Sequence, residues 1–148
     1  MHNPIEFVVN EFTGHYHFLS NFYPVEITYK GNTFTTVEAA FQAQKCFCPE
    51  AKAAFENVAP GIAKKMGRAV EMRKDWDLVK DDYMYELVKI KFSVPYLRDT
   101  LVRTSGLRLV EGNRWGDKYW GVDIASGEGQ NRLGEILMRV RDELEMEL

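Results

Sequence analysis

A carboxylate, an amide and an ammonium occur at helical spacing between Val37 and Lys45. Glu38 and Gln42 are four residues apart and Lys45 follows three residues later, so an α-helix places all three on one face. Phe41 shares that face. Such a stripe is either solvated at a helix edge or lines a polar pocket. In a pocket it would present a negative and a positive group to a ligand.

A second segment with chemical potential lies between Val110 and Leu133. It combines Trp115 and Trp120 with several carboxylates and is too rich in glycine for a helix, so we expect a loop or hairpin with close backbone approaches. Aromatic rings beside carboxylates suit a flat heteroaromatic or sugar ligand. Alternatively, the tryptophans are core anchors. Within residues 111–123 of this segment, the carboxylates are Glu111, Asp117 and Asp123.

The same segment ends in glycines just before the last expected helix. Gly129 and Gln130 would leave backbone N–H groups near a helix N-terminus, which favours phosphate. Many helices simply begin after glycine, so this pattern is weak by itself.

Length and composition indicate the setting. The chain has 148 residues, of which 28% are charged and 45% hydrophobic, the proportions of an ordinary soluble domain with its own core. A net charge of −3 does not favour a stable complex with nucleic acid. No apolar run approaches the roughly 18 residues of a membrane helix. Residues 1–6 lack the features of a signal peptide, so we expect a cytoplasmic protein.

Cysteines and histidines do not indicate a metal site. Cys46 and Cys48 are two residues apart near a helix end and would point to different faces, so they form neither a metal pair nor a disulfide. His15 and His17 would share a strand face but have no further ligand nearby. We therefore expect no metal and reduced thiols.

The expected elements give a mainly helical α+β fold in one domain over residues 1–148, with a small antiparallel sheet. Residues 25–29 and 33–35 predict a β-hairpin around a turn at 30–32. Thr36 is a plausible N-cap of the helix that carries Glu38. Leu133, Ile136, Leu137, Val140 and Leu144 form the apolar stripe of the last helix. Strand fragments are expected at 7–9 and 18–19, and other helices at 50–57, 62–68, 77–92 and from Pro95 to Arg103.

Several separated motifs resemble those of the NADAR, or YbiA-like, family of N-glycosidases, from about Phe18 to Arg141. In chain order they are Phe18-Leu19-Ser20-Asn21-Phe22-Tyr23-Pro24, Thr36-Val37-Glu38-Ala39-Ala40-Phe41-Gln42-Ala43-Gln44-Lys45, Arg73-Lys74-Asp75-Trp76-Asp77, Lys91-Phe92, Asp117-x-x-Trp120-Gly121 and Gly129-x-Asn131-x-Leu133-Gly134. The resemblance implies a multihelical YbiA-like fold and hydrolysis of an N-glycosidic bond to a ribose phosphate. Family members act on ribosylamino pyrimidine phosphates of early riboflavin biosynthesis, and others remove ADP-ribose from modified guanine. Asp123 stands where many relatives have glycine, which leaves the substrate open.

The resemblance also implies roles for individual residues. Breaking a C–N bond at an anomeric carbon develops positive charge on the ribose, which Glu38 would stabilise while it orients water. Lys45 would hold the phosphate or protonate the leaving amine. The expected catalytic residues are Glu38, Lys45, Asp117 and Asn131, and the expected substrate-binding residues are Ser20, Asn21, Gln42, Arg73, Arg114, Trp115, Trp120, Asp123 and Gly129.

Trp115 or Trp120 would stack on the base. Asp117, Asp123 and Asn131 would hold ribose hydroxyls or water. Ser20 and Asn21 would close the pocket, and Arg68, Arg73 or Arg114 would add phosphate contacts. This chemistry requires no metal or redox cofactor, and the partner is a small ribosyl-phosphate or ADP-ribosyl molecule.

Two other classes of function remain open. A non-catalytic module that binds ADP-ribose or NAD-like ligands would use the same aromatic and phosphate-binding residues but would not need an ionised, water-facing Glu38. A structural protein would use all these residues for packing.

Overall fold

A computed structural model describes residues 7–148. The N-terminal segment whose sequence speaks against a signal peptide lies outside the described residues. The chain divides into two compact units. One combines the chain up to Ser20 with Pro95–Leu148, and the other is Asn21–Val94.

The unit Asn21–Val94 contains the predicted hairpin. Strands β2 (Ile27–Tyr29) and β3 (Asn32–Phe34) pair antiparallel, with Tyr29 opposite Asn32. The turn is therefore Lys30-Gly31, with φ of 49° and 88°. Two positive φ values in a two-residue loop match the twist of a hairpin. The hairpin is confirmed, but the turn is one residue shorter than predicted because Asn32 belongs to the strand.

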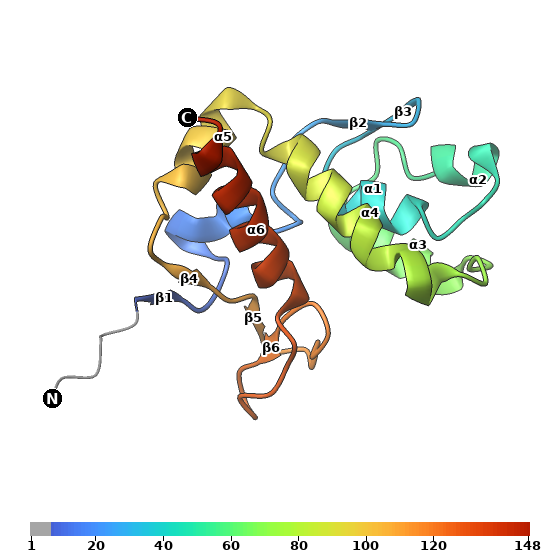
Figure 1. The fold of residues 1–148 in the computed structure, drawn as a ribbon. Coiled ribbons are helices and arrows are strands. Elements are labelled where there is room, and N and C mark those ends of the chain that lie inside the picture. The colour runs from blue at the N-terminus through green and yellow to red at the C-terminus, as the bar shows by residue number, and fades with distance from the viewer. Residues whose placement is uncertain (1–6) are drawn as a thin grey trace, which may run out of the picture. The chain divides into compact units, whose positions relative to one another are not determined.

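Four helices form the rest of this unit. They are α1 (Val37–Ala43), α2 (Pro49–Ala53), α3 (Pro60–Ala69) and α4 (Trp76–Lys91). Helix α1 is buried along its whole length. It contacts both α3 and α4, which lie next to it (Figure 1). Helix α2 is shorter than predicted, because the chain turns after Ala53. Helix α4 buries Met84, Leu87, Val88 and Lys91, the stripe that its spacing predicts.

The other unit contains most of the short strands. Its elements are β1 (Val8–Val9), the 3₁₀ helix η1 (Gly14–Leu19), α5 (Pro95–Val102), β4 (Arg108–Leu109), β5 (Gly112–Asn113), β6 (Val122–Asp123) and α6 (Arg132–Met146). Strand β1 pairs parallel with β4, and β5 pairs parallel with β6. Helices α5 and α6 lie side by side (Figure 1). The strand predicted at Phe18–Leu19 is wrong, because both residues lie in the 3₁₀ helix η1, where their side chains are buried.

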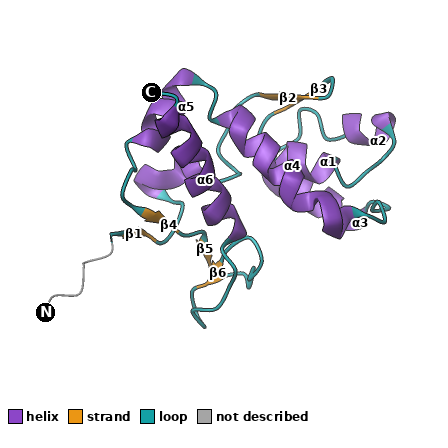
Figure 2. Cartoon of the chain, in the orientation of Figure 1, coloured by secondary structure: helices purple, strands orange, loops and turns teal. Residues whose placement is uncertain are grey.

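Helices dominate the described chain and the strands are short (Figure 2). Helix α6 buries Leu133, Leu137 and Val140, so its predicted apolar face is confirmed. The structure is the mainly helical α+β fold expected from the sequence. None of the helices in residues 7–148 is long and apolar enough to cross a bilayer.

Candidate functional site

The Glu38 stripe is buried, so the interpretation of a solvated helix edge is wrong. Thr36 caps α1, since its Oγ1 accepts a hydrogen bond from the N–H of Ala39 at 3.1 Å. Within α1 the exposed fractions of Glu38 and Gln42 are only 8% and 6%. Buried polar side chains of this kind need hydrogen-bond partners, which makes their neighbours informative.

Glu38 and Gln42 bond to each other along the helix. The Nε2 of Gln42 donates to the Oε1 of Glu38 at 2.9 Å. The Oε1 of Gln42 is buried and has no hydrogen-bond partner among the described residues. Helix α3 approaches at this point, because a Cβ added to Gly67 would lie 1.9 Å from that oxygen. The glycine therefore leaves the space that the Gln42 carboxamide occupies.

Lys45 lies just after the end of α1 and is only half-buried. Its Nζ donates to the carbonyl oxygen of Gly67 at 3.4 Å. Burial lowers the pKa of the Lys45 ammonium from its ordinary value, and the Glu38 carboxylate acts in the opposite direction. The structure thus brings Glu38, Gln42 and Lys45 together with Gly67.

Asn21 joins this group through its backbone. Its carbonyl oxygen accepts the N–H of Glu38 at 3.1 Å, and its side-chain Nδ2 contacts the sulfur of Met84 at 3.4 Å. Asn21 therefore holds the first turn of α1, where an unpaired N–H would otherwise remain. Ser20 ends η1, and its own N–H bonds to the carbonyl of His17.

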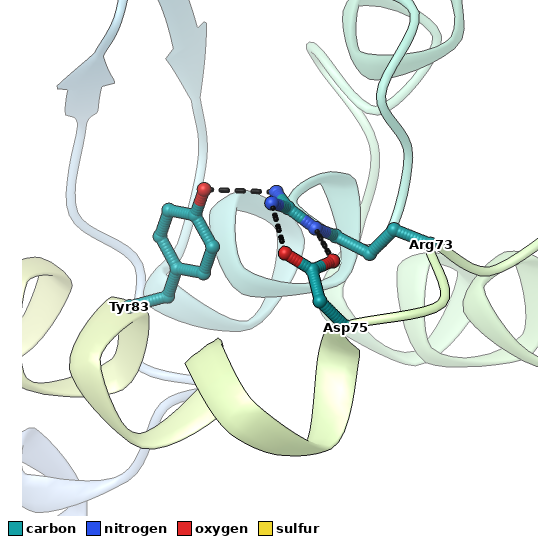
Figure 3. A network of polar contacts seen from close by, with 3 residues as sticks. All are labelled: Arg73, Asp75 and Tyr83. Carbon is teal, nitrogen blue, oxygen red and sulfur yellow. Dashed lines mark hydrogen bonds and ion pairs between the residues drawn. The ribbon is translucent and has the colours of Figure 1, made fainter.

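Arg73 is fixed by its neighbours (Figure 3). Its Nε and Nη2 donate to the two carboxylate oxygens of Asp75 at 2.6 and 3.0 Å, and its Nη1 donates to the hydroxyl of Tyr83 at 2.9 Å. The guanidinium hydrogen bonds lower the pKa of Asp75. The N–H of Arg73 also bonds to the carbonyl of Lys45 at 2.8 Å, so this network adjoins the end of the stripe.

In the other unit, two side chains shape the loop predicted between residues 110 and 133. Asn113 is 1% exposed; its Nδ2 donates to the carbonyl of Asp117 at 2.8 Å, and its Oδ1 accepts the N–H of Asp117 at 2.9 Å. The Oδ1 of Asp117 accepts the N–H groups of Tyr119 and Trp120 at 3.0 and 2.9 Å. The loop also has the close backbone approach expected of its glycines: a Cβ on Gly121 would lie 2.0 Å from the carbonyl oxygen of Glu111.

Asn131 ties this loop to its surroundings. It is 2% exposed and has a left-handed backbone, with φ of 51°. Its Oδ1 accepts the N–H of Glu111 and its Nδ2 donates to the carbonyl of Leu109, each at 2.9 Å. Both polar side-chain atoms of Asn131 therefore bond to the backbone.

The start of α6 does not offer the expected row of N–H groups to phosphate. Loop carbonyls accept them instead: the N–H groups of residues 130, 131, 132 and 133 bond to the carbonyls of residues 118, 121, 119 and 120. The sequence interpretation failed here because the loop folds back over the helix start. Gly129 packs its Cα against Gly121, where a Cβ would lie 2.2 Å from the carbonyl oxygen.

The other predicted substrate-binding residues of this unit are more exposed to solvent. Arg114 forms an exposed ion pair with Glu11 at 3.0 Å. Trp115 is 64% exposed, so it is not a core anchor. Trp120 is half-buried and its ring meets that of Tyr119 edge to face. Asp123 accepts a hydrogen bond from the hydroxyl of Ser126 at 2.8 Å.

Cys46 is buried and Cys48 exposed, and both are free thiols. Within residues 7–148, no three His, Cys, Asp or Glu side chains gather in a group that would hold a metal ion.

Comparison with known proteins places this geometry in a family. A model of the NADAR domain matches residues 7–145. The chain belongs to the NADAR family. The N-glycosidase YbiA of Shigella flexneri serotype 5b is 39% identical over 132 residues, which cover 86% of this chain and 81% of that protein. The chloroplastic riboflavin biosynthesis protein PYRR of Zea mays is 36% identical over 144 residues, which cover 84% of this chain but 23% of that protein.

A solved structure supports the fold as well. The NMR structure of the E. coli protein YbiA matches with a TM-score of 0.81 at 34% identity and covers 97% of this chain and 91% of that chain. The predicted membership of the NADAR family and the YbiA-like fold are both confirmed.

The sequence analysis did not identify three residues of this NADAR domain that position the predicted site residues. Gly67 makes room for Gln42, Tyr83 holds Arg73, and Asn113 organises the loop around Asp117. A glycine inside a helix signals close packing, so Gly67 could have been found. The roles of Tyr83 and Asn113 depend on contacts made only by the folded chain.

Proposed function

We propose that this NADAR domain hydrolyses the N-glycosidic bond of a ribosyl phosphate and that its reacting groups lie on the α1 stripe. The bond between the anomeric carbon and the base nitrogen breaks, a water oxygen joins the carbon, and the base leaves with a proton. The predicted enzyme class is confirmed, because relatives that match most of the chain are named N-glycosidases. The substrate and the roles of individual residues are the proposal.

The observation that carries the proposal is the group formed by the buried Glu38 and Gln42 and the half-buried Lys45. A carboxylate of fixed orientation stabilises the positive charge that develops on the ribose, and it does so more strongly away from water. The Gln42 amide orients one oxygen of that carboxylate. Lys45, half-buried and coupled to Glu38, supplies the positive charge for the phosphate or the proton for the leaving amine.

For the substrate we favour a ribosylamino pyrimidine phosphate of riboflavin biosynthesis. The name of the maize relative supports this choice. Removal of ADP-ribose from modified guanine is the alternative, since it breaks the same kind of bond at the same carbon of a ribose.

In the other unit we propose positioning roles for Asp117 and Asn131, because their hydrogen bonds to the backbone shape the loop. Trp120 is proposed to stack on a base, and Asp123 to hold a ribose hydroxyl. Trp115 and Arg114 are exposed enough to meet a ligand. These assignments remain predictions.

The decisive assay incubates the protein with each substrate. Release of ribose phosphate from the ribosylamino pyrimidine phosphate supports the favoured substrate, and release of ADP-ribose from ADP-ribosylated guanosine supports the alternative. Binding of either compound without any product would overturn the catalytic proposal and leave a binding module.

A further inference from the structure

A pocket outside the Glu38 stripe lies within the unit Asn21–Val94. It has a volume of about 710 Å³ and is formed by the chain around the start of α2 and by the segment that follows α3. Its lining includes Phe47, Ala51, Val70, Met72, Arg73 and Asp75. Pockets for small molecules and cofactors have volumes of roughly 300–1,000 Å³ and mostly apolar walls. This pocket therefore has the size and composition of a ligand site.

Two large apolar side chains of the pocket are exposed. Phe47 keeps 66% and Met72 keeps 48% of its surface open. A single exposed apolar side chain is ordinary, but two that line the same hollow indicate a surface that a ligand covers.

The Phe47 ring has a fixed partner on one side. The guanidinium carbon of Arg73 lies 4.4 Å from the centroid of the ring. Asp75 and Tyr83 hold that guanidinium with three hydrogen bonds (Figure 3). The stack of cation and ring is thus ordered before any ligand arrives, which reduces the entropy lost on binding.

The pocket also adjoins the proposed reaction centre through the backbone. The hydrogen bond from the Arg73 N–H to the Lys45 carbonyl joins its two walls, and Cys46, the next residue, lines it. Its rim carries the exposed Glu71 and Lys74, an acceptor and a donor for polar groups at a ring edge.

We propose that this pocket binds the planar heteroaromatic ring of a nucleotide, stacked on Phe47. The inference rests on the proposed function, since it adds a ring subsite whose lining begins at Cys46, the residue after Lys45. The Phe47 ring has one face on the immobilised Arg73 guanidinium. Its exposed face favours stacking by another flat ring, because the protein does not need to become more ordered when that ring binds. The ring is either the base that leaves the ribose or the adenine of an ADP-ribosyl group.

Methionine-methyl NMR on the full chain tests the inference without any need for turnover. Met72 reports on the pocket, and the 86% exposed Met146 of the other unit is the control. Met72→Leu assigns the resonance. The ligands are ribose 5-phosphate, which has no ring, uridine 5′-monophosphate, with a ring on the anomeric carbon, and ADP-ribose, with a ring at the distal end.

We expect a ring-bearing ligand to shift the Met72 methyl, ribose 5-phosphate not to shift it, and Met146 to stay unmoved. Phe47→Ala should weaken binding of the ring-bearing ligand by roughly 3- to 10-fold, the scale of one aromatic stack, and leave ribose 5-phosphate within twofold. Phe7→Ala is the matched control, because Phe7 is 65% exposed and lies in the other unit.

The ligand that responds identifies the source of the ring. An effect with uridine 5′-monophosphate assigns the pocket to the leaving base, and an effect with ADP-ribose alone assigns it to adenine. The inference would be overturned if no ligand shifted the Met72 methyl resonance. It would also be overturned if Phe47→Ala weakened the binding of ring-bearing ligands and of ribose 5-phosphate equally. If ring-bearing ligands bind but no hydrolysis is seen, the ring subsite is supported and the proposed function is refuted. If hydrolysis is seen but the Met72 resonance does not shift, the proposed function is supported and the ring subsite is refuted.

Discussion

Gly67 of α3 lies directly against the carboxamide of Gln42 on α1, so that a single methyl group at position 67 would lie 1.9 Å from the Gln42 Oε1. The same carboxamide donates to Glu38 at 2.9 Å. The orientation of the proposed catalytic carboxylate thus depends on a glycine in another helix.

Gly67→Ala should impair catalysis more than folding. The added methyl group displaces the flexible end of Gln42, which takes its amide away from Glu38. We expect kcat to fall by roughly 10-fold or more while the midpoint of thermal unfolding moves by only a few degrees. Steady-state kinetics and circular dichroism measure the two effects. Gly61→Ala in the same helix has open space around it and should keep full activity. Equal activities of the two variants would contradict the proposed role of Gln42.

Glu38→Gln should keep the fold and ligand binding but lose turnover by roughly 100-fold or more, the scale for removing a positioned catalytic group. The amide has the same shape and can still meet Gln42, so only the negative charge is lost. Calorimetric titration with ribose 5-phosphate checks binding, and product release checks turnover. Near-normal turnover would falsify the assignment.

Lys45→Ala should weaken phosphorylated substrates by roughly 10- to 100-fold in kcat/KM and their dephosphorylated forms far less, because a partly desolvated ammonium acts most strongly on a dianion. Lys65→Ala, an exposed lysine on α3, is the control. Equal losses for both forms would show that Lys45 is not the phosphate anchor, and protonation of the leaving amine would become its better assignment.

Local sequence patterns predicted many of the helices and their buried faces, because helical spacing and capping depend on residues that are close together in the sequence. The spacing of Glu38 and Gln42, the Thr36 cap and the apolar stripe of α6 follow from helical periodicity alone. Whether the Glu38 stripe faces water depends on how α3 and α4 pack on α1, and the sequence left that choice open.

The features that sequence analysis missed are long-range contacts. The backbone carbonyl of Lys118 accepts the N–H of Gln130, and only the folded loop brings these two groups close. Arg73 looked like a free phosphate ligand, but Tyr83 and Asp75 hold its guanidinium. Phe18 and Leu19 have strand-like residue types, yet both are buried in a 3₁₀ helix because tertiary packing outweighs local propensity.

Asn131→Ala should destabilise the protein by roughly 2–4 kcal/mol, because it removes two buried hydrogen bonds and leaves alanine in a left-handed backbone. Asn57→Ala is the matched control: Asn57 also has a positive φ, of 58°, but is exposed, so only about 1 kcal/mol of backbone strain is expected. Urea unfolding gives both values. Similar losses in the two variants would show that the hydrogen bonds of Asn131 contribute little.

Lys91 should make the stability of the protein depend on pH. Its side chain is 1% exposed, and burial lowers the pKa of the ammonium to about 7. The unfolded chain has a lysine pKa of about 10.4, so between these two values it binds more protons than the folded chain. Stability due to Lys91 therefore rises with pH from about 7 to about 10, by up to ~1.4 kcal/mol per pH unit, and is constant and lowest below pH 7.

Lys91→Met removes this titration while filling a similar volume. The free energy of unfolding of the variant minus that of the wild type should be most positive and constant below about pH 6.5, and should fall steadily as pH rises from 7 to 9.5. Urea unfolding at pH 5.5, 6.5, 8 and 9.5, followed by circular dichroism, measures it. Lys89→Met, at an exposed position of the same helix, should give a difference that does not change with pH. A Lys91→Met difference as flat as that of the control would mean that Lys91 stays charged when buried.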